Sequence, residues 1–434
     1  MLFEDISILD EDFNYQEHMW VGVLNDRIDY IGSSAPADAA KYGEVYAGAG
    51  RLMMPGMYNA HAHAPMTLLR GYAENLPLQA WLNDTVWPFE AKMTAEDNYW
   101  ATLLSCAEMA RYGCVSFSDM NYHTPERARA VEESGLKANL CTSPLAFEPK
   151  PIQEYPCFAE MQDGIANYNG AANGRIKFDA CIHAEYTNND VTCASVVEWA
   201  KENGVCMQVH VSETKSEVED CRGRHDGKSP VQWLDSLGAF DVPFVADHCV
   251  WVDDEDIAIL AKKGVSVAHN PASNMKLASG FAPIAKMFDA GVNVCIGTDG
   301  MASNNNHDMF QDMYLMALLS KGYELDPAII TPKQVLSAAT VNGAKSQGRT
   351  DCGLIKQGYK ADLCVLDVTG ASWCPMINPI VNVVYAGHGT DVVLTMCDGE
   401  VVYKDGEFPR IDIEAVKAEV EARSKRIIKE VQEG

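Results

Sequence analysis

Short apolar runs typical of β-strands alternate eight times with longer helical patterns between residues 57 and 350. The runs occupy residues 57–63, 114–120, 138–144, 176–183, 205–211, 243–248, 265–269 and 292–299. Helical patterns lie between them, for example at 95–112, 191–203, 253–262 and 282–290. This alternation favours an α/β fold, a parallel (β/α)8 TIM barrel. An open doubly wound sheet is the alternative, but no G-x-G-x-x-G phosphate loop follows an early strand.

Both ends of the chain are rich in strand patterns of a different kind. Strands are expected at 2–9, 20–24, 27–31 and 44–54, and again at 361–366, 392–397 and 400–403. Asp398-Gly399 between the last two is a strong hairpin signal. We therefore expect a composite β-sandwich from residues 1–56 and 351–410, a barrel over 57–350, and a C-terminal helix within 411–434.

Composition narrows the class of protein. The fourteen cysteines are scattered singly without a C-x-x-C pair, which favours reduced core residues over disulfides or a thiolate metal site. A net charge of −27 argues against nucleic acid and anionic membranes as partners. The chain has no run of eighteen apolar residues, and its N-terminus lacks a signal-peptide pattern. The expected location is cytoplasmic.

Histidine and carboxylate side chains gather where the expected barrel strands end. His61 and His63 lie on one face of the first strand, and Asp299 ends the eighth. Later strands end in further histidines, so that six of the eleven histidines converge on one rim: His61, His63, His183, His210, His248 and His269. In a TIM barrel the carboxyl ends of the strands line the active site. A single His-x-His pair could be half-exposed surface, but the whole set favours a metal site.

Imidazole and carboxylate ligands suit one divalent ion. Zinc is the default, and Fe²⁺, Mn²⁺ and Ni²⁺ accept the same ligands. Three histidines, one aspartate and a water at the open position form a hydrolytic site, since the metal lowers the pKa of the water. A second metal is not expected, because the fourth strand ends in His183 instead of a lysine that could bridge two ions.

Longer motifs resemble a known family over essentially the whole chain. They are PGMYNAHAH at 55–63, MTLLRGYA at 66–73, WPFE at 87–90, HVSET at 210–214, HNPASN at 269–274, KLASG at 276–280, TDGMASNN at 298–305 and ADL at 361–363. The chain resembles the amidohydrolase superfamily, and within it the methylthioadenosine/S-adenosylhomocysteine deaminase branch, which is related to cytosine deaminases and triazine hydrolases.

The resemblance implies a role for each site residue. The metal ligands would be His61, His63, His210 and Asp299. Glu213 would be the general acid/base, His248 would polarise the water, and Asp299 would also orient it. The substrate pocket would be lined by Trp87, Glu90, His183 and His269, with Glu90 on the ribose hydroxyls.

The expected activity is hydrolytic deamination of an adenosine-type nucleoside to the inosine analogue and ammonia. Candidate substrates are 5′-methylthioadenosine, 5′-deoxyadenosine, adenosine and S-adenosylhomocysteine. A metal-bound hydroxide would attack C6 while Glu213 carries the proton to the ring, since one carboxyl group can serve both steps. The zinc signature of cytidine deaminases is absent from the sequence.

Two positions depart from the branch. Trp251 stands where a second histidine is expected, beyond the ligands. The loop at 141–147 has no arginine, whereas relatives that take the homocysteine substrate resemble one another in having one there. A neutral or apolar 5′ substituent is therefore expected. His123, His225, His307 and His388 are interpreted as ordinary surface or loop residues.

Two other functions stay open at this point. The first is the same metal chemistry on another ring, such as guanine or an s-triazine, against which Glu90 and His183 argue because a bare ring has no ribose. The second is a non-catalytic scaffold on the same fold, against which the intact ligand set argues. The expected partner is a small-molecule nucleoside, and the chain is expected to form a homo-oligomer.

Overall fold

The computed structural model describes residues 1–142 and 144–433. Ser143, which falls within the expected third strand and the arginine-free loop, lies outside the described residues. Among the described helices, none is long and apolar enough to cross a membrane. All fourteen cysteines lie in the described part of the chain and all are free, as the sequence predicts.

The middle of the chain is built from parallel strands that are buried along their length. They pair as two five-stranded sheets. The first sheet has the order β15 (Asp299–Gly300), β6 (Met57–His63), β7 (Cys114–Asn121), β8 (Lys137–Thr142) and β9 (Ile176–Phe178). The second has the order β10 (Ala180–Ala184), β11 (Met207–Val211), β12 (Phe244–His248), β13 (Ser266–His269) and β14 (Asn293–Ile296).

Two of the predicted strands are interrupted, and this divides the sheet. The run at 176–183 breaks at Asp179 into β9 and β10, and the run at 292–299 breaks at Gly297-Thr298 into β14 and β15. Each half pairs with a different sheet. The parallel α/β arrangement is thus confirmed, whereas closure into one eight-stranded barrel stays a prediction.

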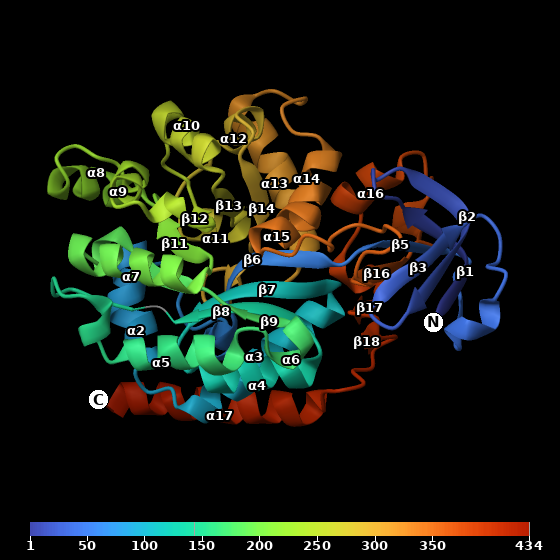
Figure 1. Ribbon diagram of the computed structural model, residues 1–434, viewed down its shortest axis with the longest axis horizontal. Helices are drawn as coiled ribbons and strands as arrows, with labels where there is room; N and C mark the ends of the chain where they lie inside the picture. The colour runs from blue at the N-terminus through green and yellow to red at the C-terminus, as the bar shows by residue number, and fades with distance from the viewer. Residues whose placement is uncertain (143, 434) are drawn as a thin grey trace.

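Helices cover the outside of these sheets (Figure 1). The predicted helices correspond to α3 (Ala95–Arg111), α7 (Asp190–Asn203), α10 (Asp254–Lys263) and α12 (Ile284–Asp289). The others in this part are α1 (Leu78–Trp81), α2 (Trp87–Glu90), α4 (Thr124–Ser134), α5 (Cys157–Asp163), α6 (Ala171–Gly174), α8 (Lys215–Arg224), α9 (Pro230–Ser236), α11 (Pro271–Lys276), α13 (Met309–Glu324), α14 (Pro332–Ala339) and α15 (Val341–Ser346).

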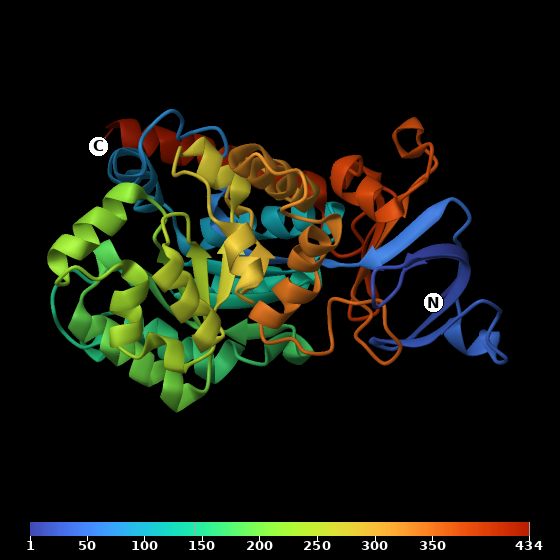
Figure 2. The same cartoon turned by 90° about the horizontal axis from the view of Figure 1, so that it is seen from above.

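The two ends of the chain meet in one sheet beside the parallel strands (Figures 1 and 2). Its order is β18 (Glu400–Lys404), β17 (Val392–Cys397), β16 (Leu363–Asp367), β5 (Arg51–Pro55), β1 (Leu2–Leu9), β2 (Tyr15–Leu24) and β3 (Arg27–Gly32), with β4 (Val45–Ala47) paired to β1. The pairing of β5 with β16 joins the N-terminal and C-terminal strands. All eight strands share this one sheet, so two facing sheets of a sandwich are not seen among the described strands.

The last helix lies along the outside of the molecule. Helix α17 (Ile413–Glu433) runs beneath α3 and α4 in Figure 1, whereas α16 (Pro379–Tyr385) lies near the composite sheet. Arg423 donates to the carboxylate of Asp97 at 2.9 Å, and Arg426 contacts the same group. Ser424 Oγ donates to the carbonyl of Leu68 at 2.9 Å. These contacts tie the end of the chain to the segment that follows the first histidine pair.

Candidate active site

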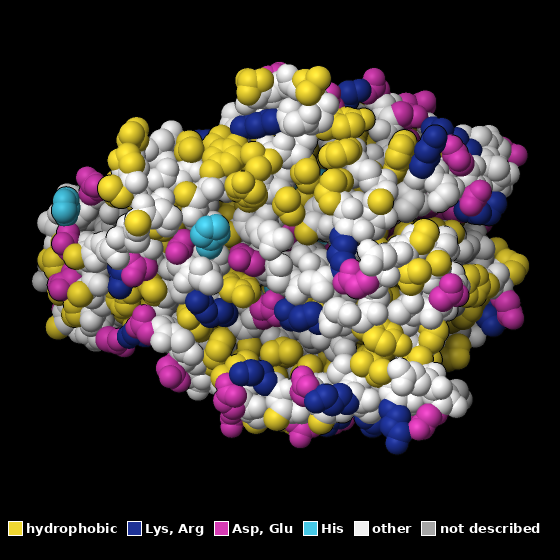
Figure 3. All heavy atoms as spheres, turned by 180° about the vertical axis from the view of Figure 1, so that it is seen from behind, with side chains coloured by type: hydrophobic (Ala, Val, Ile, Leu, Met, Phe, Trp, Pro, Cys, Tyr) yellow, Lys and Arg dark blue, Asp and Glu magenta, His cyan; other side chains and the backbone are white. Residues whose placement is uncertain are grey.

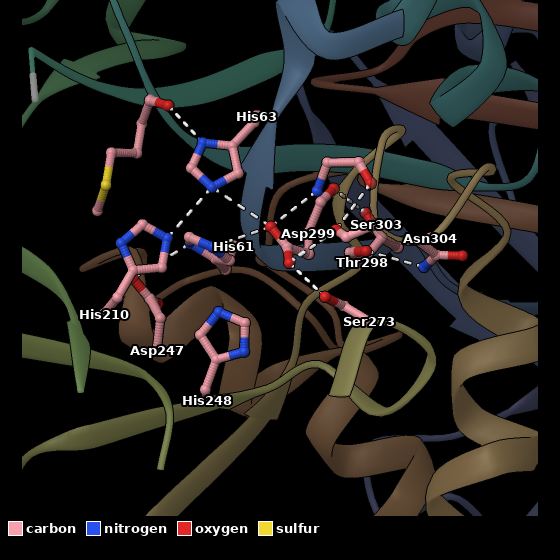
Figure 4. A network of polar contacts seen from close by, with 12 residues as sticks. His61, His63, His210, Asp247, His248, Ser273, Thr298, Asp299, Ser303 and Asn304 are labelled. Carbon is pink, nitrogen blue, oxygen red and sulfur yellow. Dashed lines mark hydrogen bonds and ion pairs between the residues drawn. The ribbon is translucent and has the colours of Figure 1, made fainter. Parts of the chain in front are cut away.

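Four predicted ligands converge at the ends of three strands (Figure 4). His61 and His63 come from β6, His210 from β11 and Asp299 from β15. The Nε2 atoms of His63 and His210 lie 3.2 Å apart. Asp299 Oδ1 lies 3.4 Å from His61 Nε2 and 3.3 Å from His63 Nε2. Three imidazole nitrogens and one carboxylate oxygen therefore face a common point.

The backbone is strained where it aims these side chains. Asp299, His248 and Ser212 have φ values of 61°, 71° and 53°, in the left-handed region that residues other than glycine rarely adopt. Gly297 is needed for a close approach, since a Cβ there would lie 2.8 Å from His61 Cβ and 2.2 Å from the side chain of Asn270. Residues held in this conformation at active sites are often part of how the site is built.

Hydrogen bonds fix the outward-facing atoms of the ligands. His63 Nδ1 lies 2.6 Å from the carbonyl oxygen of Met120, and His210 Nδ1 lies 2.8 Å from that of His183. The second oxygen of Asp299, Oδ2, accepts from Ser273 Oγ at 2.6 Å and Ser303 Oγ at 2.9 Å. The atoms of these three residues that face the common point are thus Nε2, Nε2 and Oδ1, the last of which also accepts from the backbone N–H of Gly300 at 2.8 Å.

The arrangement fits a divalent cation. His61 is fully buried, and neither of its ring nitrogens has a hydrogen-bond partner of good geometry among the described residues. Burial opposes protonation of His61, but the carboxylates of Asp247 and Asp299 outweigh it and raise its pKa to about 10. Burial likewise opposes ionisation of Asp299, yet the neighbouring histidines hold its pKa well below the usual range. A cluster that attracts positive charge this strongly suits a metal ion.

Glu213 lies beside the ligands on a buried turn. Its Oε1 accepts from Ser279 Oγ at 3.3 Å, and its Oε2 lies 4.0 Å from His248 Nε2. The ring of His248 is oriented by Asn274, whose Oδ1 lies 2.8 Å from Nδ1. Burial raises the pKa of Glu213, while the nearby His248 opposes the rise. A carboxyl group with a raised pKa beside an imidazole can take up and return a proton.

A second buried carboxylate holds this turn. Glu217 accepts backbone N–H groups from Ser212 at 2.8 Å, Glu213 at 2.7 Å and Thr214 at 3.3 Å. Burial, with the charge of Glu213, raises the pKa of Glu217 to about 8. Trp251 adds to the same support, because its backbone N–H donates to Ser212 O at 2.8 Å and its indole N–H to Ser279 O at 2.6 Å. The tryptophan that departs from the family pattern thus lies behind Glu213, outside the ligand cluster.

A cavity opens from the ligands toward the short helices that follow β6. Trp87, Glu90 and His183 line it together with Glu213 and His248. The ring centroids of Trp87 and His183 lie 6.5 Å apart. Burial raises the pKa of Glu90 to about 7 and lowers that of His183 to about 3, the latter with help from neighbouring histidines.

One predicted pocket residue lies elsewhere. His269 is buried and lines a separate cavity with Met275, Phe281 and Tyr323. Much of the rest of the first cavity's wall is apolar (Met66, Leu78, Trp81, Leu82, Val86, Met120 and Leu277), and Asn121, Tyr122 and Tyr186 add uncharged polar groups. No lysine or arginine is among the described residues that line it.

The sequence missed several residues that support the site. Ser273 and Ser303 lie within quoted motifs but were given no role, and Asp247 and Glu217 lie outside those motifs. His307, interpreted from the sequence as a surface or loop residue, is fully buried, which corrects that prediction. Its Nε2 lies 2.9 Å from Ser105 Oγ and its Nδ1 lies 2.9 Å from Thr298 Oγ1, next to Asp299. Its place seven residues beyond a strand end gave no sign of this burial.

A cluster of three imidazoles and a carboxylate at the carboxyl ends of parallel strands, beside a buried acid, is typical of metal-dependent hydrolases. The Amidohydrolase family model matches residues 52–402, and the chain belongs to this family. It is 40% identical over 432 residues to a 5-methylthioadenosine/S-adenosylhomocysteine deaminase of Dictyoglomus thermophilum, covering 99% of each chain.

Two further proteins are similar over most of their length. A 5′-deoxyadenosine deaminase of Methanosarcina mazei is 42% identical, with 88% of each chain covered. The crystal structure of an adenosine deaminase from Xanthomonas campestris with bound zinc superposes with a TM-score of 0.92 at 31% identity, covering 99% of this chain and 98% of the other.

Proposed function

We propose that this protein hydrolytically deaminates adenosine-type nucleosides, giving the inosine analogue and ammonia. The observation that carries the proposal is the shared cavity, in which Glu213 and His248 lie beside the ligand cluster while Glu90 and His183 line the wall. Glu213 and His248 can transfer a proton near the ligand cluster, and Glu90 and His183 on the cavity wall can bind a ribose. The deaminase names of the relatives support the same reaction class.

His61, His63, His210 and Asp299 would hold one divalent ion, with zinc as the first candidate because the similar adenosine deaminase binds zinc. Such an ion, when bound, activates a water molecule as a nucleophile near neutral pH. Glu213 takes a proton from the water as its oxygen adds to C6 of the adenine ring. The same carboxyl group returns the proton to the ring nitrogen N1. The remaining hydroxyl proton passes to the exocyclic amino group, and the C6–N bond breaks to release ammonia as the C6 carbonyl forms.

The far wall of the cavity favours a neutral 5′ substituent. An α-amino acid at the 5′ position would bring a carboxylate, and burying a charge without a partner is costly. The described lining offers apolar side chains, the uncharged polar groups of Asn121, Tyr122 and Tyr186, and no lysine or arginine. We therefore rank 5′-methylthioadenosine, 5′-deoxyadenosine and adenosine above S-adenosylhomocysteine.

The test is a substrate panel. Purified protein, with its metal content measured, is incubated with each of the four nucleosides, and ammonia and the spectral change of the purine are followed. We expect turnover of the three neutral nucleosides and a lower kcat/KM for S-adenosylhomocysteine. Absence of ammonia from all four by a metal-loaded protein would exclude the proposed function.

The alternative of a bare ring substrate is separated by Glu90. If Glu90 binds ribose hydroxyls, Glu90→Gln lowers kcat/KM for adenosine but leaves that for 2′,3′-dideoxyadenosine nearly unchanged. Asp84→Asn, an exposed substitution in the same wall segment, is the control. An enzyme of guanine or an s-triazine would lose little activity toward its own ring in the Glu90 variant.

We also propose that the two parallel sheets act as one barrel, since β10 lies beside β8 and β14 beside β6. A homo-oligomer is proposed as the working form. Its support is a group of exposed hydrophobic side chains in and near α13: Phe281, Tyr314, Leu318, Tyr323 and Leu325. Hydrophobic side chains also gather on the upper part of the face in Figure 3. Light scattering that gives a monomer mass at micromolar concentration would exclude the oligomer.

A further inference from the structure

The three histidines proposed as metal ligands are oriented in the same way, and only the group that faces Nδ1 differs among them. Each directs Nε2 to the common point (Figure 4), and each has an oxygen atom close to Nδ1. For His63 and His210 that oxygen is a neutral backbone carbonyl, of Met120 and His183 respectively. For His61 it is the carboxylate of Asp247, with Oδ2 at 3.1 Å from Nδ1.

Asp247 is isolated apart from this contact. It lies on β12 opposite His210 and is completely buried. Neither of its oxygens has a hydrogen-bond partner of good geometry in the described part of the chain, and His61 provides its one ion pair there. A buried carboxylate without partners is costly, so its presence calls for a compensating positive charge close by.

The charges of the site supply that compensation. Three neutral imidazoles and ionised Asp299 leave one positive charge of a divalent ion unbalanced. Asp247, in contact with the ligand His61, provides the second negative charge without occupying a coordination position. Carboxylates behind metal-bound histidines fix the ring tautomer and make the imidazole a stronger ligand.

We propose that Asp247 is a positioning residue that holds the Nδ1 proton of His61, presents Nε2 to the metal ion, and makes His61 the strongest of the three histidine ligands. The proposal rests on the metal site proposed above. The sequence pattern does not predict this role, because on a regular strand the side chains of Asp247 and His248 would point to opposite faces. The left-handed backbone of His248 breaks the strand alternation, so that Asp247 and His248 can both face the site.

Two substitutions separate orientation from charge. In Asp247→Asn the amide oxygen can still accept from Nδ1, but the charge is lost. In Asp247→Ala both are lost. The matched control is Asp179→Asn, since Asp179 is also buried among the parallel strands but accepts from Asn139 at 2.9 Å and Gln208 at 2.7 Å instead of a histidine.

The readouts are the equilibrium affinity for Zn²⁺, measured by competition with a chromogenic chelator, and the rate of zinc release. We expect affinity to fall about tenfold in Asp247→Asn and roughly 100-fold in Asp247→Ala, with faster release in the same order, and no change in Asp179→Asn. The melting temperatures of the metal-free wild type and variants are measured alongside, so that loss of the Asp247–His61 ion pair from the metal-free fold is separated from loss of zinc affinity.

Two results would overturn the proposal. One is zinc affinity within about twofold of wild type in folded Asp247→Asn, a change far below the tenfold effect of such residues. The other is a lowered melting temperature of the metal-free variants with unchanged zinc affinity, which would assign Asp247 a purely structural role. A wild-type protein that binds no zinc would instead contradict the proposed metal site itself, so the two failures are distinguishable.

Discussion

The cluster of proposed metal ligands (His61, His63, His210 and Asp299) and the proposed substrate wall (the cavity lining between Leu78 and Glu90) are built from different kinds of structure. The ligands are buried at the ends of β6, β11 and β15, and hydrogen bonds or ion pairs fix their second atoms. The wall comes largely from short helical turns between Leu78 and Glu90, where Trp87 and Glu90 are only partly buried. In the first region each side chain is held in one orientation by its contacts. In the second region side chains can be replaced without disturbing the strands.

This difference separates chemistry from selection. Changes at the ligand cluster and at Glu213 should lower kcat for every substrate by a similar factor. Changes at the wall should act mainly on KM and should differ among substrates. A protein in which wall changes lowered kcat uniformly would show that the two regions are coupled.

The largest effect is expected from removing the metal. Dialysis against a chelator should abolish ammonia release from all substrates, and stoichiometric Zn²⁺ should restore it. The His61→Ala variant should be inactive and should not recover with Zn²⁺, because a fully buried ligand has been lost. Full activity in protein shown to be free of metal would break the assignment of the ligand cluster.

The next largest effect is expected at Glu213. Replacement by Gln keeps the size of the side chain but removes proton transfer, so kcat should fall by about 10²- to 10⁴-fold. Zinc content and KM should stay near the wild-type values, and both are measured on the same preparation. The exposed Glu219→Gln variant on α8 provides the control. Equal loss of kcat in both variants would contradict a specific role for Glu213.

A smaller loss is expected at Glu217, which holds the Glu213 turn through three backbone N–H groups. Gln presents only one acceptor oxygen, so the turn should shift and kcat should fall by up to about 100-fold. The loss should be the same for each nucleoside, as steady-state kinetics on two substrates would reveal. A change confined to KM would instead indicate that Glu217 affects substrate binding and not the chemical step.

The smallest effect is expected from titration of Glu90. Its pKa is raised to about 7 by burial, so the carboxylate that can accept ribose hydroxyls forms only as the pH rises through that value. KM for adenosine should therefore fall severalfold between roughly pH 6 and 8, whereas Glu90→Gln should lack this dependence. A KM that is flat across this range in the wild type would argue against ribose contact by Glu90.

The same shift has a consequence for stability. The folded state binds the Glu90 proton more tightly than the unfolded chain, whose carboxyl group has the ordinary pKa of 4.5. The contribution to stability is complete below that value and is lost as the pH rises through about 7. Chemical denaturation of the wild type and Glu90→Gln across this range would measure the difference.

The sequence predicted those parts of the site that follow from strand periodicity. His61 and His63 share a face because i and i+2 do so on any strand, and strand ends placed His210, His248 and Asp299 at one rim. Periodicity gives no information on which buried residues contact the proposed ligands and hold them in place. Asp247 and Ser273 were missed for this reason, and His307 was misjudged because a loop residue can still be buried.

The fold was predicted to a similar extent. Eight apolar runs indicated the parallel strands, but their pairing depends on local breaks such as those at Asp179 and at Gly297-Thr298, which the run pattern did not predict. The composite sheet was anticipated from strand patterns at both ends, whereas its single hydrogen-bonded order could not be read from them. The division into domains at 1–56 with 351–410, 57–350 and 411–434 stays a prediction.

Helix α17 has a consequence for how the protein is made. The carboxylate of Asp97 is fully buried and has Arg423 and Arg426 as its cationic partners, while Leu68 receives a hydrogen bond from Ser424. During synthesis these partners leave the ribosome more than 300 residues after Asp97. The segment that leads from the first histidine pair into the substrate wall therefore stays incompletely supported until residues 423–426 have been made. A nascent chain that has already formed β6, β11 and β15 would therefore still have an incompletely packed substrate wall.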